Sequence, residues 1–291
     1  MPMSDTTVAR VALAAIMRIP LTPRRILFYG ALHRRLPRLR NPQRFTDKVN
    51  WRVRHDRREL LAPTCDKLAM KELASATAGH SVRVPQTLWA GTDLRDLGSV
   101  DLPDRWILKP AHRFGKIIVG HGQPDIDDLL DRTDGWLDNE NWQLMGEWGY
   151  SRATPRILVE ERIGTSDALP SDYKFFVFAG VARYVLVVSD RVADPRASYY
   201  DTSWNRVATH PGAEDLPLVP APPHLSEMIA IAERIAHGFD FLRVDLYDVD
   251  GHVWFGETTA YPMSGLGRYS PDSFDEELGS WWTLPDLRAD P

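Results

Sequence analysis

The chain has 291 residues, enough to bury the core of one large domain or two smaller ones without disulfide or metal staples. Its net charge of -5 and pI near 6.0 argue against a general nucleic-acid binder, because phosphate neutralisation needs clustered lysine and arginine. The single cysteine, Cys65, excludes an intramolecular disulfide framework and favours a reducing compartment, so we expect a cytoplasmic protein.

The N-terminal region, residues 7–40, is expected to form one or two helices with a break at IPLTPRR, where two prolines stop regular structure. Its apolar run is too short to span a membrane and lacks the layout of a signal peptide. No acid lies between Asp5 and Asp47, and arginines accumulate there: Arg10, Arg18, Arg24, Arg25, Arg34, Arg35, Arg38 and Arg40. We favour a helix packed on the catalytic body over a basic amphipathic helix that makes peripheral contact with an anionic membrane.

Two further helices are predicted before residue 80. Thr46 and Asp47 open a segment with an apolar residue at every third or fourth position. Asp66 then caps the helix KLAMKELASATAG, and Gly79 is its expected C-terminal stop.

The rest of the chain is dominated by strand-like apolar runs, at residues 83–91, 105–111, 116–120, 156–163, 173–180, 181–191 and 252–258. Helices are expected at 125–132 and 224–239. Two strand pairs are predicted to be hairpins that turn at Ala179–Gly180 and at Asp250–Gly251. The sequence therefore predicts a mixed α+β fold with antiparallel hairpins.

The second hairpin, RVDLYDVDGHVWFGETT, gathers charged residues. Arg243 and Asp245 are two apart on one strand, hence on one face, and Glu257 lies on the partner strand with Thr259 on the same face. Two carboxylates and a hydroxyl form an all-oxygen set suited to Mg²⁺. The plain alternative is a hairpin with surface charges, but Arg243 beside two carboxylates is what phosphoryl transfer needs.

Two other segments carry candidate residues. In RWILKPAHRFGKIIVG, Lys109 ends an apolar strand and a loop with Gly115 and Lys116 follows, which describes a hairpin covering a phosphate. In RILVEERIGTSDALPSDYKFF, a strand end leads to Asp172 and Lys174, which share one face of the next strand. Exposed strand ends are the plain alternative for both.

Taken in order, these pieces resemble the ATP-grasp superfamily and, within it, the branch of the teichuronopeptide-biosynthesis protein TupA. The resemblance rests on DKLAMKELA, WILKPAHRFGKIIVG, ILVEERI, SDYKFFVFAG, LRVDLYDV and FGETTAYPMSG, in residues 40–270. It implies an ATP-grasp fold in which two α+β subdomains clasp MgATP, preceded by a short helical N-terminal region. The implied boundaries are 1–60 for the helical region, 61–105 for the first part of the body, 106–165 and 166–275 for the small and large subdomains, and 276–291 for the tail.

The resemblance also implies residue roles. Lys67 and Lys109, with the loop residues Gly115 and Lys116, correspond to the groups that bind the ATP phosphates. The adenine hinge corresponds to Glu160, Glu161, Arg162 and Ile163, and Asp172 lies by the ribose or phosphates. Asp245, Glu257 and Thr259 correspond to the metal ligands, and Arg243, which steadies an acyl phosphate, is counted as catalytic together with Lys174. Thr259 stands where most ATP-grasp ligases have asparagine, and the phosphate loop is poor in glycine.

The implied activity is an ADP-forming carboxylate–amine ligation through an acyl phosphate, with ATP and Mg²⁺ as cofactors and a small carboxylate and an amine as substrates. Amide bonds in cell-envelope polymers or peptide natural products are the expected setting. Two alternatives stay open: a kinase-like phosphotransferase, and a nucleotide-binding accessory protein without catalysis.

Overall fold

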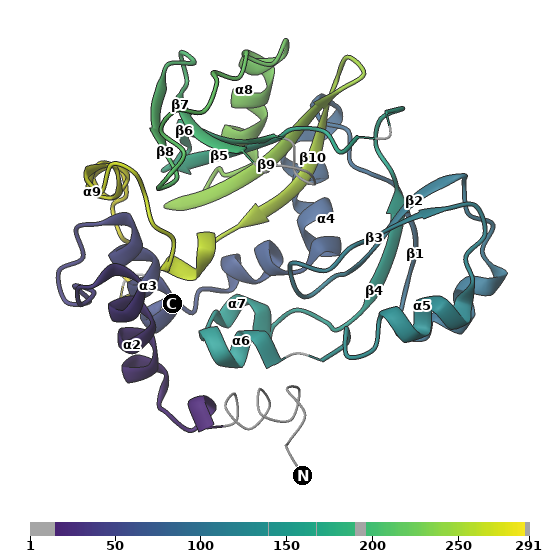
Figure 1. Ribbon diagram of the computed structural model, residues 1–291, viewed down its shortest axis with the longest axis horizontal. Coiled ribbons are helices and arrows are strands. Elements are labelled where there is room, and N and C mark those ends of the chain that lie inside the picture. The colour runs from purple at the N-terminus through teal and green to yellow at the C-terminus, as the bar shows by residue number, and fades with distance from the viewer. Residues whose placement is uncertain (1–14, 139, 167, 190–195, 289–291) are drawn as a thin grey trace.

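The computed structural model describes residues 15–138, 140–166, 168–189 and 196–288 (Figure 1). Within these residues the chain forms an α+β fold with two antiparallel sheets, as expected. The small sheet has the order β1-β4-β2-β3, and the large sheet has the order β10-β9-β5-β6-β7-β8. No helix in this part of the chain is both long and apolar enough to cross a membrane.

The small sheet has a core of its own. Its strands are β1 (Thr87–Gly91), β2 (Arg105–Pro110), β3 (Ile118–His121) and β4 (Ile157–Glu161). The short helices η3 (Leu94–Ser99) and α5 (Ile126–Arg132) contact each other and cover the sheet, and Asp125 caps α5 as its side chain accepts from two main-chain amides. Leu97, Trp106 and Leu129 are among the buried residues of this core. The domain boundaries stay a prediction, although β1, from the segment 61–105, pairs with β4 in this sheet.

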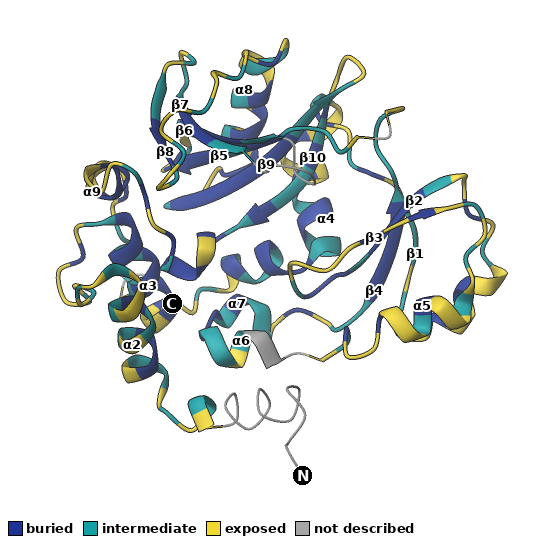
Figure 2. Cartoon of the chain, viewed as in Figure 1, coloured by how far each residue is buried: buried dark blue, intermediate teal, exposed yellow. Residues whose placement is uncertain are grey.

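The large sheet contains the main core, and the burial in Figure 2 is concentrated on its central strands. Its strands are β5 (Asp172–Phe178), β6 (Val181–Ser189), β7 (Arg196–Asp201), β8 (Arg206–Thr209), β9 (Phe241–Val249) and β10 (His252–Thr259). Two helices, α4 (Lys67–Ala78) and α8 (Leu225–Ile235), contact each other and pack on it. Asp66 caps α4 as predicted, accepting from the amide of Leu68 at 2.9 Å, and Gly79 ends it with φ of 57°.

The two predicted hairpins are confirmed, whereas the strands β7 and β8 were not predicted from the sequence. Ala179–Gly180 and Asp250–Gly251 all have positive φ, the conformation that a two-residue turn of this kind requires. In β7, the neighbours Tyr199 and Tyr200 are both 1% exposed. A strand buried on both faces lacks the alternation that identifies strands in sequence, which explains the miss.

The N-terminal helices pack against the C-terminal tail. The helix α2 (Leu21–His33) begins directly after Pro20, and Pro23 lies in its first turn, so the predicted break covers too many residues. Prolines are tolerated there because first-turn amides have no partner within the helix. The helix α3 (Phe45–His55) contacts both the turn η4 (Pro262–Gly265) and α9 (Ser273–Ser280). The choice between a packed helix and a membrane-bound helix concerns the segment 8–20, and most of it lies outside the described residues.

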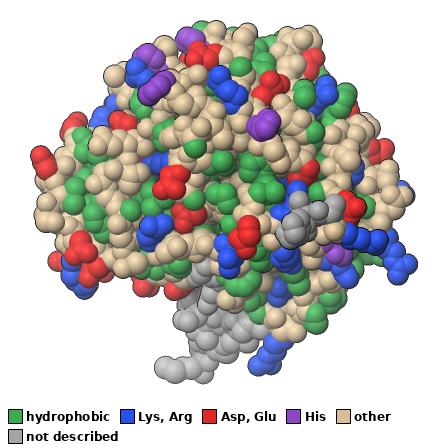
Figure 3. Space-filling model, turned by 180° about the vertical axis from the view of Figure 1, so that it is seen from behind, with side chains coloured by type: hydrophobic (Ala, Val, Ile, Leu, Met, Phe, Trp, Pro, Cys, Tyr) green, Lys and Arg blue, Asp and Glu red, His purple; other side chains and the backbone are tan. Residues whose placement is uncertain are grey.

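The surface near α2 is basic. Arg34, Arg38 and Arg40 are exposed, and Figure 3 shows blue side chains gathered at the lower right of the face seen from behind. The exposed leucines Leu27 and Leu36 lie in the same stretch.

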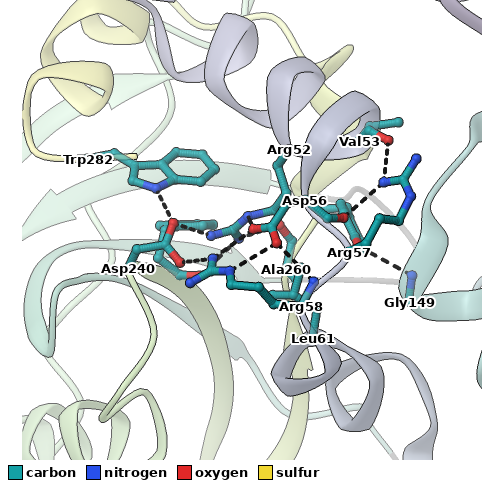
Figure 4. A network of polar contacts seen from close by, with 12 residues as sticks. Arg52, Val53, Asp56, Arg57, Arg58, Leu61, Gly149, Asp240, Ala260 and Trp282 are labelled. Atoms are coloured by element: carbon teal, nitrogen blue, oxygen red, sulfur yellow. Dashed lines mark hydrogen bonds and ion pairs between the residues drawn. The ribbon is translucent and has the colours of Figure 1, made fainter. Parts of the chain in front are cut away.

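A buried ionic network joins α3, β9, β10 and the tail (Figure 4). We call it the closed network: Arg52, Asp56, Arg58, Asp240 and Trp282. Arg52 is 0% exposed, donates to Asp240 at 2.6 Å, and donates through Nη1 to the carbonyls of Phe241 and Ala260 at 3.0 Å. The indole of Trp282 donates to the same aspartate at 2.6 Å, while the Arg52 guanidinium lies 4.4 Å from its ring centroid. Every charge in the network therefore meets a partner.

Candidate active site

Three adjacent strands of the large sheet place charged side chains at one level. In the register of the sheet, Asp245 of β9 lies opposite Lys174 of β5 on one side and Glu257 of β10 on the other. Arg243, two residues before Asp245, lies opposite Thr259. The predicted convergence of the two carboxylates is therefore present.

A β-bulge at Gly256 sets the direction of Glu257. Between Phe255 and Glu257 the pairing shifts by one residue, so Phe255 points into the core at 1% exposed while Glu257 points to the opposite face. A side chain at Gly256 would bring a Cβ within 2.9 Å of the Tyr247 ring and 3.0 Å of the Asp245 carbonyl oxygen. Only glycine fits this bulge without displacing its neighbours.

Arg243 is the centre of the resulting cluster. Its guanidinium binds Asp245 through two bonds of 2.7 Å and reaches Glu257 at 3.1 Å. Lys174 donates to Asp172 at 2.5 Å and also to Asp245. Asp245 is 0% exposed, whereas the Glu257 side chain is 33% exposed, so the cluster opens to solvent at Glu257.

The cluster holds its charges in their ionised forms. Burial alone would raise the pKa of Asp245, but Arg243 and Lys174 outweigh burial and hold that pKa below its usual range. Burial would lower the pKa of Lys174, yet the Asp245 carboxylate raises it above its ordinary value. We call Lys174, Arg243, Asp245 and Glu257 the cleft cluster.

Lysines from the small sheet and from α4 lie around Glu160. Lys109 of β2 is ion-paired with Glu160, and Lys71 of α4 reaches its other oxygen at 2.6 Å. Lys71 also donates to the Thr87 hydroxyl at 3.0 Å. Glu160 is 5% exposed, and the two lysines hold its pKa low against the opposing effect of burial. Its carboxylate thus orients lysines and is closed to other partners.

Lys71 was missed by the sequence analysis. It lies four residues after Lys67 on α4, and that spacing places both lysines on one helical face. The signal was therefore present in the sequence.

Lys67 connects the two groups of charges. Its Nζ donates to the carbonyl of Arg113 in the β2–β3 loop at 2.6 Å. Burial lowers its pKa to about 8, Glu257 acts to raise it and Lys109 to lower it. Charges from both sheets act on the pKa of Lys67, so this lysine lies where the two sheets face each other.

A pocket occupies the space between the sheets. Small-sheet and hinge residues line one side of it, among them Ile107, Lys109, and the segment 160–163. Tyr247, Phe255 and Gly256 of the β9–β10 hairpin line the other side. Apolar walls with a lysine at one end are the arrangement that a purine with attached phosphates requires.

Other predicted residues are peripheral in this structure. Gly115 and Lys116 are exposed at the end of the β2–β3 hairpin, where Gly115 has φ of 76°. The Glu161 carboxylate accepts from the main chain of Gln86 at 2.7 Å, and Arg162 donates to the carbonyl of Ser166 at 3.3 Å. These side chains do not join the cleft cluster.

Tyr150 is a second residue that the sequence analysis missed. It is half-buried, and its ring lies 6.4 Å from that of Phe114 in the β2–β3 loop. Burial raises its pKa, and the charges of Glu147 and Glu257 act in the same direction. Nothing in the surrounding sequence GYS signals this position.

The residues present fit a magnesium ion that is also held by a nucleotide. Among the described residues, no group of three or more His, Cys, Asp or Glu side chains converges to hold a metal without help. Two neighbouring carboxylates that depend on substrate phosphates for further ligands are the usual protein contribution to such a site. Asp245 and Glu257 supply these carboxylates, with the Thr259 hydroxyl on the same face.

A comparison with known protein families gives one match that covers most of the chain. The family model described as TupA-like ATPgrasp matches residues 47–283. The chain belongs to the TupA-like ATP-grasp family. This membership places the chain among ATP-grasp proteins, and no curated protein matches it in sequence.

Solved structures of ATP-grasp ligases are similar to the family member described here at low identity. D-alanine–D-alanine ligase from Bacillus anthracis, complexed with ATP, is 13% identical over 67% of this chain and 53% of its own, with a TM-score of 0.38. The VanG D-Ala:D-Ser ligase from Enterococcus faecalis is 13% identical over 75% of this chain and 60% of its own, with a TM-score of 0.44. The ATP-grasp ligase PsnB, complexed with minimal precursor, Mg and ADP, is 13% identical over 69% and 52%, with a TM-score of 0.37. This chain therefore spans little more than half the length of these ligases.

Proposed function

We propose that this TupA-like ATP-grasp protein is an ATP-dependent, ADP-forming ligase that joins a carboxylate to an amine through an acyl phosphate. The observation that carries the proposal is the row formed by Lys174, Asp245 and Glu257, bridged by Arg243. This row adjoins a pocket whose lining includes Lys109 and Gly256, the residue before Glu257. Carboxylates for a metal, a guanidinium and phosphate-binding lysines are the parts that phosphoryl transfer uses.

The nucleotide is proposed to lie in the pocket between the sheets. Its adenine would lie against the hinge segment 160–163 and Phe255, with its ribose and phosphates toward Asp172 and Lys174. Lys67 and Lys109 would bind the phosphates, and the loop with Gly115 and Lys116 would close over them. Glu160 would hold Lys109 and Lys71 in place rather than contact the base with its carboxylate.

Asp245 and Glu257 would hold Mg²⁺, with Thr259 beside them, and the bound ion would offset the negative charge that builds up on the phosphate oxygens. For Glu257 this is consistent with its carboxylate, which is partly exposed and therefore accessible to an ion. Arg243 would exchange part of its present contact with the two carboxylates for a contact with the transferred phosphoryl group.

The reaction balances without a protein nucleophile. A substrate carboxylate oxygen attacks the γ-phosphorus of ATP, the bond to the β-phosphate oxygen breaks, and ADP leaves. The amine nitrogen then attacks the carbonyl carbon of the acyl phosphate, inorganic phosphate leaves and the nitrogen loses a proton. Cys65 is buried with its thiol pKa raised, which agrees with its having no role in these steps.

The acceptor would approach from the turn that follows β10, where Ser264 and Gly265 lie next to the end of the metal-binding strand. The substrate classes follow from the family resemblance: an amino acid or uronic acid as the carboxylate, in the cytoplasmic synthesis of a cell-envelope polymer or a peptide product.

An ADP-release assay over a panel of carboxylates and amines tests the proposal, with mass spectrometry of the products. An amide together with ADP and phosphate is the expected result, whereas a stable phosphoester would identify a kinase-like phosphotransferase. Glu257→Gln is expected to abolish turnover with the fold intact by circular dichroism. Normal turnover in that variant would rule out the metal assignment, and no ADP with any substrate pair would favour the accessory-protein alternative.

A further inference from the structure

The turn between β10 and α9 has an unusual backbone. Met263, Ser264 and Gly265 have φ values of 46°, 54° and 66°, so three successive residues lie in the left-handed region. For residues other than glycine this conformation is unfavourable, and it persists only where the surroundings impose it. The turn begins three residues after Thr259, which ends the strand that carries Glu257.

Two buried residues of the N-terminal helices impose this conformation. Arg25 of α2 donates to the Ser264 hydroxyl at 2.8 Å and also to the Ser264 carbonyl oxygen. Asn50 of α3 donates to the Gly265 carbonyl at 2.8 Å and accepts from Arg25 at 2.6 and 3.0 Å. Arg25 is 4% exposed and Asn50 is 3% exposed, so solvent does not compete for these bonds.

Close packing on the same side prevents the turn from relaxing toward α3. A Cβ on Gly265 would lie 2.7 Å from the Asn50 side-chain nitrogen and 2.9 Å from Cβ of Val49. On the other side, the Met263 side chain is 53% exposed. The turn is therefore fixed at its base and open at its tip.

The turn lies near the cleft cluster. Tyr261, at the start of the turn, accepts from the main-chain amide of Gly149 at 3.3 Å, and Gly149 is followed by Tyr150. The charge of Glu257 in the cleft cluster acts on the pKa of Tyr150. Tyr150 also lies against Phe114 of the β2–β3 loop. The base of the turn and the proposed phosphate site thus share one neighbour.

We propose that Arg25 is a positioning residue that holds the turn 261–266 in the left-handed conformation needed to receive the acceptor, so that the N-terminal helical region forms one wall of the acceptor side. The proposal rests on the proposed ligase function. It assigns a task to the basic N-terminal region that its sequence does not indicate, because Arg25 and Ser264 are 239 residues apart.

The chain supplies a matched control in Arg24. Arg24 is also 4% exposed and belongs to the same helix, but it donates to the main chain of Gln143 and of Met17 rather than to the turn. Arg24→Gln therefore removes a buried arginine from α2 without removing a contact to Ser264. Arg25→Lys retains one charged donor for the turn.

The first measurement is hydrogen–deuterium exchange of the full chain. In the wild type, the amides of Ser264 and Leu266 are bonded to the carbonyls of Tyr261 and Met263, each at 2.9 Å. Arg25→Gln is expected to raise their exchange rates by about tenfold or more, with Arg24→Gln unchanged at the same amides. Unchanged protection in Arg25→Gln, or equal loss in both variants, would overturn the proposal.

The second measurement separates binding of the acceptor from binding of ATP. Arg25→Gln is expected to raise KM for the acceptor by about tenfold and to leave ATP affinity, measured by calorimetry, unchanged, with partial rescue in Arg25→Lys. A parallel loss of ATP affinity would overturn the positioning role. If the wild type releases no ADP with any substrate pair, the ligase function fails, and the exchange measurement still decides whether Arg25 holds the turn.

Discussion

The closed network and the cleft cluster are built from the same kinds of residue, yet their charges are satisfied in different ways. In the closed network two arginines meet two aspartates, and Nη1 of Arg52 also donates to two main-chain carbonyls. In the cleft, Arg243 and Lys174 share Asp245, while Glu257 is partly open to solvent. The charges of the first arrangement are buried and paired with one another, whereas the second includes a carboxylate that is partly open to solvent.

The difference between the two clusters shows that burial of an ion pair does not by itself identify a functional site. A buried pair with complete partners serves the structure, because removing one member leaves an uncompensated charge. A cluster whose cations can transfer to another anion is suited to a phosphate-bearing ligand. Around the pocket, the surplus is positive: the lysines Lys67, Lys71, Lys109 and Lys174 and Arg243 face four carboxylates, those of Glu160, Asp172, Asp245 and Glu257.

The largest expected effect comes from replacing the central arginine of each cluster, Arg52 in the closed network and Arg243 in the cleft cluster. Arg52→Met is expected to lower the free energy of unfolding by about 3–5 kcal/mol, because Asp240 keeps only Arg58 as an ionic partner and the carbonyls of Phe241 and Ala260 lose the buried donor they share. Arg243→Met is expected to cost less, because Lys174 still neutralises Asp245, but to abolish ligase turnover. Urea unfolding and the ADP-release assay measure the two effects. Equal stability losses would show that the two clusters do not differ in kind.

Glu147 is a buried carboxylate whose negative charge is less well neutralised than those of the carboxylates in either cluster. Burial raises its pKa from 4.5 to about 7, so the folded protein binds a proton that the unfolded chain releases between those values. Stability is therefore expected to fall on the order of 3 kcal/mol as the pH rises from 4.5 to 7, and to level off above that. Glu147→Gln should flatten this profile in urea unfolding followed across pH. A wild-type profile that rises over the same window would contradict the assignment.

Gly256 tests how the cleft cluster obtains its geometry. Gly256→Ala is expected to lower stability by about 1–3 kcal/mol, because the new Cβ meets the Tyr247 ring and the Asp245 carbonyl. Turnover should fall further than stability accounts for, since the bulge directs Glu257. Gly251→Ala, at the hairpin turn with open space around it, is the control for backbone strain without the clash. Equal losses of turnover in both variants would show that the bulge does not set the position of Glu257.

Titration of Lys67 is expected to have a smaller effect, on the affinity for ATP. Its pKa near 8 means that it is protonated below that pH and increasingly neutral above it. ATP affinity, measured by calorimetry, is therefore expected to fall by up to about tenfold between pH 7 and pH 9. Lys67→Met should bind more weakly at pH 7 and lose this step. The same step in Lys67→Met would assign the titration to another group.

Much of the local structure could be predicted because it depends on neighbours in sequence. Asp66 and Gly79 delimit α4 through bonds to adjacent main chain, and Asp250–Gly251 supplies a turn that requires positive φ. The shared face of Arg243 and Asp245 follows from the two-residue period of a strand. The family resemblance added an ordered set of candidate roles, and the family itself is confirmed.

The register of Glu257 in the β9–β10 hairpin could not be predicted from the sequence. Counting back from the turn at 250–251 without a bulge pairs Glu257 with Val244, which is on the opposite face from Asp245. The structure pairs Glu257 with Asp245 because the bulge at Gly256 inserts one residue. The expectation that the carboxylates converge was right, but the register that achieves it was not contained in the spacing.

The α+β class, the helix caps and the hairpin turns could be read from the sequence, since each depends on a few consecutive residues, whereas the residues for phosphate and metal chemistry stay a prediction. What only the tertiary structure decided is which distant side chains meet: Lys71 with Glu160, Tyr150 with Phe114, and Arg25 with Ser264. Such contacts depend on how the helices pack on the two sheets, and packing is set by the whole core rather than by a local pattern.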